Sequence, residues 1–160
     1  MFEYISTHFE WQNTIMIVST RGRYALRVMV DLAQHQEDGY VPLNVIAGRQ
    51  DISEKYLESI LKVLVQDELL TGLRGRGGGY RLTKEPKDYT LGEILRLTEG
   101  SLAPVACTDD GEHDCPRKES CPSHPVWQKL DTMINDFFDG ITLADLIQPT
   151  SDKAEKDTAK

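Results

Sequence analysis

The sequence predicts a mainly α-helical protein with a small β wing, an α+β fold in which a winged helix-turn-helix precedes a long C-terminal dimerisation helix. Three observations predict this fold. Two short helical segments separated by a tight turn lie between residues 41 and 66. A glycine-rich hairpin, LRGRGGGYR, follows them directly, and an acidic cysteine-containing loop leads into a long helix with an apolar face.

The totals are those of a small soluble protein. A chain of 160 residues suits one domain, or a small domain with an appendage. No apolar run approaches membrane-spanning length, and Met1–Ile15 has no basic or apolar signal region, so a cytoplasmic protein is expected. Three cysteines are an odd number, which in a reducing compartment favours metal or redox chemistry over disulfides.

The charge is distributed unevenly along the chain. The net charge is −8, but residues 16–82 carry nine Lys and Arg against eight Asp and Glu. Residues 83–160 carry nine against sixteen. The first half can therefore bind DNA through its clustered arginines, whereas the acidic second half is a poor contact surface for phosphates.

The pattern divides the chain into five segments. We expect a flexible N-terminal extension at 1–15, a DNA-binding winged helix-turn-helix at 16–100, a Cys/His cluster-binding loop at 101–124, a dimerisation helix and helical turn at 125–148, and a disordered tail at 149–160.

The first helix begins in the segment STRGRYALRVMVDLAQ. Thr20 is the predicted cap, and one face carries the apolar residues Tyr24, Ala25, Val28, Met29, Leu32 and Ala33. Residues 41–50 then predict a short helix. After a tight turn, Ser53 caps a helix that buries Leu57, Ile60, Leu61, Leu64 and Val65 on one face. Any helical hairpin shares this pattern, so the pair alone is weak evidence for a helix-turn-helix.

The hairpin after these helices supplies the missing context. Alternation on either side of the glycines predicts two strands, roughly Leu70–Arg74 and Tyr80–Leu82. The glycine spacing fits neither a dinucleotide-binding nor a P-loop motif. We interpret the hairpin as a wing whose tip, including Gly77 and Gly78, lies against the DNA backbone. Arg74 and Arg76 would then reach phosphates or a narrow minor groove, although a plain flexible turn is the alternative.

The second half begins with a short helix. Thr90 and Glu93 have capping-box spacing and Gly100 ends this helix. The predicted long helix runs from Pro125 to Asp139, and its stripe consists of Val126, Leu130, Met133, Ile134, Phe137, Phe138 and then Ile141. Such a stripe requires a partner, and a two-fold mate is expected rather than packing on the same chain.

All three cysteines lie in the loop between these helices. Cys107, Cys115 and Cys121 are followed by His124, which the start of the long helix would hold at its cap because Pro125 suits the first helical position. Three thiolates and an imidazole can bind zinc or an iron–sulfur cluster. His113 is a rival ligand, and three reduced, unligated thiols are the plain alternative.

The order of these motifs resembles the Rrf-type winged-helix repressors, and within them the branch of iron–sulfur cluster regulators. The stretches that carry the resemblance are STRGRYALRVMVDLA, VPLNVIAGRQDISEKYLESI, LRGRGGGYRLTKEPKDYTLGEILRLTEG, the cysteine loop and ITLADLI. The resemblance implies a homodimer. It also implies a [2Fe–2S] cluster held at positions matching Cys107, Cys115, Cys121 and His124, with zinc as the alternative metal. The first gap between cysteines is two residues longer than the family pattern.

On the DNA side, the resemblance implies contacts from Lys55, Tyr56, Glu58, Ser59 and Arg74. Glu58 matches a glutamate that helps the cluster-free form reject one class of operator, and Ser59 replaces the usual glutamine. We also expect DNA contacts from the start of the first helix, at Thr20, Arg21, Arg23 and Tyr24. Relatives that sense nitric oxide have an aspartate where Arg23 stands, which argues against that branch.

The resulting hypothesis is a sequence-specific DNA-binding transcriptional regulator, most simply a repressor, that an iron–sulfur cluster modulates. It would control iron–sulfur biogenesis or related stress genes, with double-stranded DNA, a second copy of the chain and the iron–sulfur assembly machinery as partners. The alternative is a regulator of cysteine or sulfur metabolism that senses through a thiol switch, zinc or a protein partner. A zinc-stabilised interaction module is a third hypothesis. An enzyme is not expected, because no nucleophile–base pair or cofactor fingerprint is present.

Overall fold

The computed structural model describes residues 18–109 and 115–147. The expectations for residues 1–15 and 149–160, and for His113, lie outside these ranges. The α-helices are α1 (Thr20–Gln34), α2 (Leu43–Gln50), α3 (Glu54–Gln66), α4 (Leu91–Glu99), α5 (His124–Asp139) and α6 (Leu143–Ile147), and the strands are β1 (Leu70–Leu73) and β2 (Gly79–Leu82). Short 3₁₀ helices are η1 (Gln36–Asp38), η2 (Pro86–Asp88), η3 (Ala106–Thr108) and η4 (Lys118–Ser120). The predicted mainly helical fold with a two-stranded wing is confirmed.

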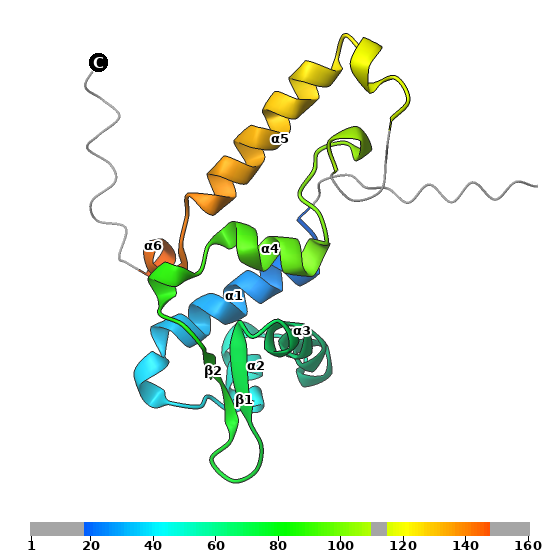
Figure 1. Cartoon of the computed structure of the whole chain (residues 1–160). Coiled ribbons are helices and arrows are strands. Elements are labelled where there is room, and N and C mark those ends of the chain that lie inside the picture. Colours follow the sequence, from blue (N-terminus) through cyan, green and yellow to red (C-terminus); the bar gives the residue numbers. More distant parts are fainter. Residues whose placement is uncertain (1–17, 110–114, 148–160) are drawn as a thin grey trace, which may run out of the picture.

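Helix α1 is the centre of the fold, since it contacts α2, α3, β2, α4 and α6 (Figure 1). Its predicted apolar face is buried except for the half-buried Tyr24, and Ala25, Val28 and Met29 are fully inaccessible. The predicted cap was wrong by one residue. Ser19 has the extended backbone of a cap and its Oγ accepts the Gly22 N–H at 3.2 Å, whereas Thr20 is already the first helical residue.

Helices α2 and α3 form the helix-turn-helix. The turn between them includes Asp51 in the left-handed region, at φ 53°, and the buried Ile52. Ser53 caps α3 as predicted, because its Oγ accepts the Tyr56 N–H at 3.4 Å. The predicted apolar face of α3 is buried at Leu57, Ile60, Leu61 and Leu64, and this burial fixes which face of α3 remains in solvent.

The wing contains one more backbone segment than the sequence suggested. Strands β1 and β2 pair antiparallel, from Leu70 opposite Leu82 to Leu73 opposite Gly79. Val41 and Tyr80 also exchange two backbone hydrogen bonds of 2.9 Å, so residue 41 pairs with β2 as an isolated antiparallel bridge. A Cβ atom at Gly79 would lie 2.2 Å from the Val41 carbonyl oxygen, so this close approach requires glycine.

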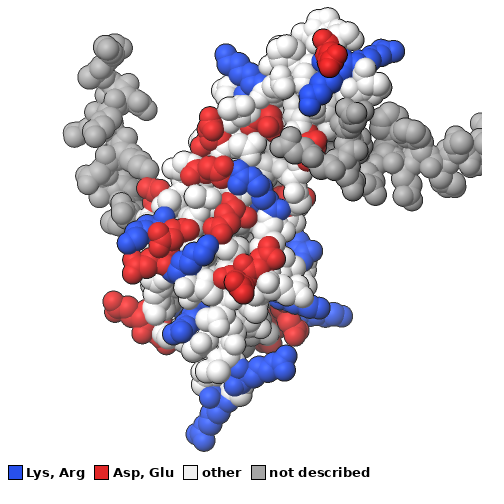
Figure 2. Space-filling model, in the orientation of Figure 1, with Lys and Arg blue, Asp and Glu red and all other residues white. Residues whose placement is uncertain are grey.

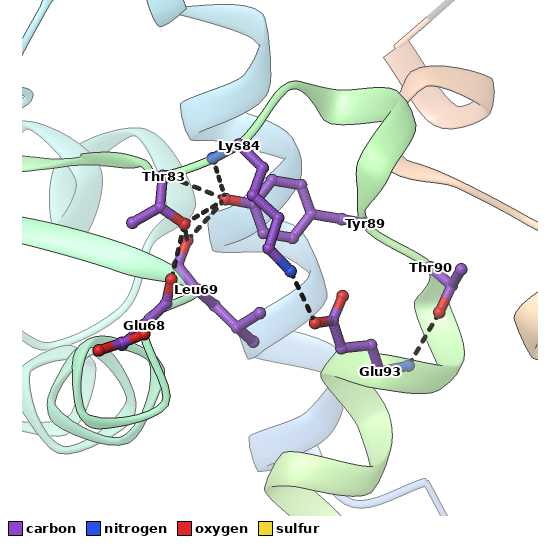
Figure 3. Close-up of polar contacts among 7 residues, drawn as sticks. All are labelled: Glu68, Leu69, Thr83, Lys84, Tyr89, Thr90 and Glu93. Carbon is purple, nitrogen blue, oxygen red and sulfur yellow. Dashed lines mark hydrogen bonds and ion pairs between the residues drawn. The ribbon is translucent and has the colours of Figure 1, made fainter.

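The base of the wing is fastened to the segment before α4 by one tyrosine (Figure 3). The fully buried Tyr89 donates its hydroxyl proton to the Leu69 carbonyl at 2.8 Å and accepts the backbone N–H groups of Thr83 and Lys84 at 2.9 and 2.8 Å. Thr90 caps α4 through the Glu93 N–H as predicted. The reciprocal half of the capping box is not made, since the Glu93 carboxylate instead accepts from Lys84 at 3.1 Å.

Helix α5 extends away from the winged helix-turn-helix (Figure 1). Its C-terminal half is attached to α4 by Arg96, whose guanidinium donates to Asn135 at 2.8 Å and to Asp139 at 2.6 Å. After α5 the chain turns back, and α6 places Leu143 in the core with no exposed surface. Helix α5 starts at His124, so the prediction of His124 as its cap and Pro125 as its first helical residue was wrong by one position. Ser123 is the cap.

Candidate nucleic-acid interface and metal-binding loop

The solvent face of α3 carries the predicted recognition residues. Lys55, Tyr56, Glu58 and Ser59 are all exposed, because the opposite face of the same helix packs into the core. Tyr56 is 37% exposed although it is aromatic, so its ring is available to a partner. Helix α3 therefore presents a cation, an aromatic ring, a carboxylate and a hydroxyl on one continuous surface, groups that can bond base edges.

The wing presents the second part of the surface. Arg74 and Arg76 are exposed, and Lys and Arg side chains gather at the lower end of the molecule in Figure 2, where Figure 1 places the hairpin. At the tip, Gly77 has a φ of 76° that favours glycine. A Cβ atom at Gly78 would lie 2.2 Å from the Leu73 carbonyl oxygen. The glycines thus permit a tight tip that projects both arginines.

A groove of about 650 Å³ separates α3 from the wing. Glu58 and Lys62 line it from α3, and Arg74 and Leu73 line it from the hairpin. Sequence reasoning missed Lys62 and Leu73 as site residues, although Lys62 lies on the exposed polar face of α3. Leu73 is 50% exposed, an unusual apolar residue at the edge of a charged groove.

The start of α1 joins this surface through contacts with α3. The Arg21 guanidinium donates to the Ser59 carbonyl at 3.3 Å, and the Tyr24 and Tyr56 rings meet edge to face at 6.0 Å. The Arg23 guanidinium donates to the Thr20 hydroxyl at 3.2 Å. The structure therefore brings Arg21 and Tyr24 against α3. Arg27, which sequence reasoning missed, lies 5.2 Å over the Tyr24 ring and bonds Gln50.

The predicted metal ligands lie on two sides of a segment outside the described residues. Cys107 is in η3, which packs against α5, while Cys115 and Cys121 flank η4. All three thiols are free and partly exposed. Within residues 18–109 and 115–147, no group of three or more His, Cys, Asp and Glu side chains converges as a metal site would. The structure thus does not assemble the four predicted ligands into one centre.

His124 nevertheless has a feature that a metal ligand would have. Its side chain is only 6% exposed, and both Nδ1 and Nε2 are buried without a hydrogen-bond partner in the part of the chain that the structure describes. A buried imidazole usually satisfies both nitrogens, because an unpaired buried polar group costs about 1–3 kcal/mol. The donor set of three thiols and this imidazole therefore fits a bound metal or cluster.

Cys121 lies close to this histidine in the chain and is predisposed to ionise. Its Sγ lies 3.3 Å from the Ser123 hydroxyl, and this hydrogen bond lowers the pKa of the Cys121 thiol, with smaller contributions from the backbone N–H groups of Ser123 and His124 and from Arg117. The thiolate is the form that binds metals. A lowered pKa thus favours the form of the thiol that binds metals.

The outward face of α5 is apolar. Val126, Leu130, Met133 and Phe137 are 60%, 38%, 58% and 62% exposed, and their spacing of three or four residues places them in one stripe. No helix among the described residues is long and apolar enough to cross a membrane. A stripe of this kind on a helix that leaves the core requires a partner surface.

Comparisons with known proteins identify the family to which this fold belongs. The family model described as "Rrf2: Iron-dependent Transcriptional regulator" matches residues 18–149. The HTH-type transcriptional regulator IscR of Aliivibrio salmonicida is 36% identical over 149 residues, covering 90% of this chain and 88% of its own, and that of Yersinia enterocolitica is 34% identical over 150 residues, covering 91% and 90%.

Two solved structures extend the likeness to the fold. IscR of T. potens is 41% identical with a TM-score of 0.63, covering 82% of this chain and 85% of its own. CymR of B. subtilis, described as the global cysteine regulator, is 33% identical with a TM-score of 0.67, covering 83% and 97%. These relatives are regulators of transcription and not enzymes, as predicted. The chain belongs to the Rrf2 family of DNA-binding transcriptional regulators.

Proposed function

We propose that this regulator binds its operator as a homodimer and that a [2Fe–2S] cluster, held by Cys107, Cys115, Cys121 and His124, sets its operator affinity. The unpartnered, buried imidazole of His124, seen among the described residues, is the observation that carries the proposal. When bound, such a cluster supplies a redox-active centre that oxidants and iron shortage can remove. In the cytoplasm, the iron–sulfur assembly machinery would be its source.

The DNA part of the proposal assigns roles to the exposed residues. Helix α3 enters the major groove, where Lys55, Tyr56 and Ser59 contact bases or phosphates, and the wing places Arg74 and Arg76 on the flanking backbone. The carboxylate of Glu58 is repelled by phosphates unless a cytosine amino group donates to it, so it selects between operators. Thr20, Arg21, Arg23 and Tyr24 extend the contact to the start of α1, and Gly77 and Gly78 let the tip approach the backbone.

The dimer part rests on the exposed stripe of α5. A second copy of α5 would cover the exposed apolar residues and join two DNA-binding units with two-fold symmetry, as a palindromic operator requires. Because α5 begins at His124, the same helix carries both the dimer contact and one ligand. Loss of the bound group would therefore free the N-terminal end of the dimer helix.

The first test is a metal assay. The protein purified without oxygen should show visible charge-transfer absorption and equal amounts of iron and sulfide. A colourless protein with one zinc per chain would contradict the cluster and favour a zinc-stabilised module. A protein without metal, even after anaerobic reconstitution, would favour the alternative regulator of cysteine or sulfur metabolism that uses a thiol switch or a protein partner.

The second test links the loop to DNA. Operators can be selected from a random-sequence library with the cluster-loaded wild type. We expect the triple variant Cys107→Ala, Cys115→Ala, Cys121→Ala to differ from the loaded wild type by about fivefold or more in Kd on at least one class of selected duplex, the lower end of typical coupling. Equal affinities on every duplex would refute cluster sensing but leave DNA binding intact.

A further inference from the structure

A carboxylate from α4 holds the N-terminus of α1. One oxygen of Glu99, Oε1, accepts both the backbone N–H of Ser19 at 3.2 Å and the Ser19 hydroxyl at 2.8 Å. The same hydroxyl accepts the Gly22 N–H at 3.2 Å, so the cap of α1 and the Glu99 carboxylate form one hydrogen-bonded unit. Eighty residues of chain separate the two partners.

The contact compensates for a feature that α1 lacks. Helix N-termini favour a nearby negative charge, and usually an acidic residue in the first turn supplies it. The first turn of α1 contains no acidic residue, so Glu99 provides this charge from another helix. The approach is close, because a Cβ atom at Gly22 would lie 2.0 Å from Glu99 Oε1. The position of the end of α4 therefore determines how the start of α1 is held.

From the start of α1 the contact continues to the recognition helix. Arg21, two residues after the cap, donates to the carbonyl of Ser59 on α3 at 3.3 Å. Its Nε atom is buried and has no hydrogen-bond partner within the described ranges, so the Arg21 guanidinium is incompletely satisfied in this arrangement. An unpaired buried donor costs free energy, so this guanidinium would gain from an alternative acceptor. A small movement of the first turn of α1 would therefore change its bond to Ser59.

On its other side, Glu99 is the last residue of the helix that leads into the cysteine loop. Gly100 ends α4 with a φ of 82°, and Leu102 and Ala103 are buried at 3% and 5% exposure. Cys107 follows four residues later in η3, which packs against α5. The path along the chain from Cys107 to Glu99 is therefore short, and it runs through a buried pair.

We infer that Glu99 is a positioning residue that transmits the state of the cysteine loop to the DNA-binding surface, through Ser19 and then Arg21. This inference rests on the proposed function, because it requires a loop whose state affects DNA. A transmitting Glu99 contact differs from a purely structural cap in one measurable respect. A structural cap changes stability or overall affinity alone, whereas a transmitting contact sets the ratio of affinities between the two states of the loop.

The experiment is a double-mutant cycle on the full chain. Wild type and Glu99→Ala are each compared with the same protein carrying the three Cys→Ala substitutions, on a fluorescent duplex that the loaded wild type selected from a random-sequence library. We expect the wild-type affinity ratio of about fivefold or more to fall below about twofold in Glu99→Ala. Glu99→Gln should restore part of the ratio, since its amide oxygen can accept the same two bonds although the charge is lost.

Two further variants make the result specific. Ser19→Ala removes the hydroxyl from the other side of the contact and should also reduce the ratio, which keeps the test decisive if Glu99→Ala does not fold. Glu85→Ala removes an equal charge from a solvent-exposed pair with Lys87 and should leave the ratio unchanged. Thermal unfolding of each variant separates an effect on stability from an effect on coupling.

The outcomes distinguish the two proposals. A wild-type ratio that persists in both Glu99→Ala and Ser19→Ala would overturn the role of Glu99 and leave the proposed function standing. A ratio near one in the wild type itself would overturn loop sensing, and the transmitting role with it. A ratio that falls in Glu99→Ala and returns in part in Glu99→Gln would support both.

Discussion

Residues 18–100 and residues 101–147 differ in how far their groups find partners within the chain. In the first region, the apolar faces of α1 and α3 are buried, and the Tyr89 hydroxyl donates a hydrogen bond to the Leu69 carbonyl at the base of the wing. In the second, the apolar stripe of α5 is exposed and the two nitrogens of His124 lack partners among the described residues. The difference indicates that the first region finds most of its partners within the chain, with Leu143 of α6 completing its core, whereas the second leaves groups for the proposed partner and bound group.

The largest expected effect tests the packed core of the first region. Leu61 on α3 is fully buried, and Leu61→Ala should reduce the free energy of unfolding by about 2–5 kcal/mol, because it leaves a cavity in a packed core. Urea denaturation measures this change. Leu146→Ala, at a position 44% exposed on α6, is the matched control and should change stability by no more than about 0.5 kcal/mol.

The second prediction tests the incompleteness of α5. Phe137 is 62% exposed in the single chain, and Phe137→Asp should weaken dimerisation by about 2–4 kcal/mol, because it puts a charge into an apolar interface. Sedimentation across a range of concentrations measures the dissociation constant. Gln128→Asp adds the same charge on the opposite face of α5 and should leave it unchanged. Equal effects of both variants would place the interface elsewhere.

The third prediction compares a paired buried group with an unpaired one. Tyr89→Phe leaves the Leu69 carbonyl and two backbone N–H groups without the tyrosine hydroxyl, so it should cost about 1–3 kcal/mol of unfolding free energy. In the metal-free protein, His124→Leu removes two nitrogens that are unpaired within the described ranges and should be close to neutral or stabilising. Urea denaturation of the metal-free proteins measures both changes.

A large loss of stability in metal-free His124→Leu would contradict this comparison, because it would mean that the imidazole is already satisfied by the chain. Reconstitution with iron and sulfide provides the complementary measurement. We expect wild type and Tyr89→Phe to take up iron equally, whereas His124→Leu should retain less, since one of the four proposed ligands is missing.

The sequence predicted the first region well because its patterns are local. The buried faces of α1 and α3 follow from a period of 3.6 residues, and Ser53 and Thr90 are caps that the structure confirms. The errors at Thr20 and His124 are each one residue, since neighbouring Ser and Thr residues compete as caps and Pro tolerates either of the first two helical positions.

Contacts between distant segments could not be predicted in this way. Nothing near Val41 indicates a bridge to Tyr80, and no local pattern pairs Ser19 with Glu99 eighty residues away. The groove residues Lys62 and Leu73 were missed for the same reason, because α3 and the wing meet only after folding. The ligand assignment of the cysteine loop came from the resemblance, and it stays a prediction.

The smallest expected effect is on the salt dependence of DNA binding, and it tests which region contacts the DNA. Removing one side chain that binds a phosphate reduces the slope of log K against log salt concentration by about 1, or by about 2 in a dimer, where the substitution occurs twice. Lys62 and Arg74 line the groove, so Lys62→Ala and Arg74→Ala should each reduce the slope. Leu73→Ala should lower the affinity for DNA without changing the slope. Lys118→Ala, an exposed lysine in η4, is the control and should alter neither. A slope that responds to Lys118 but not to Lys62 would place the DNA on the cysteine loop. Residues 18–100 would then be a scaffold, and residues 101–147 would be the region that binds DNA.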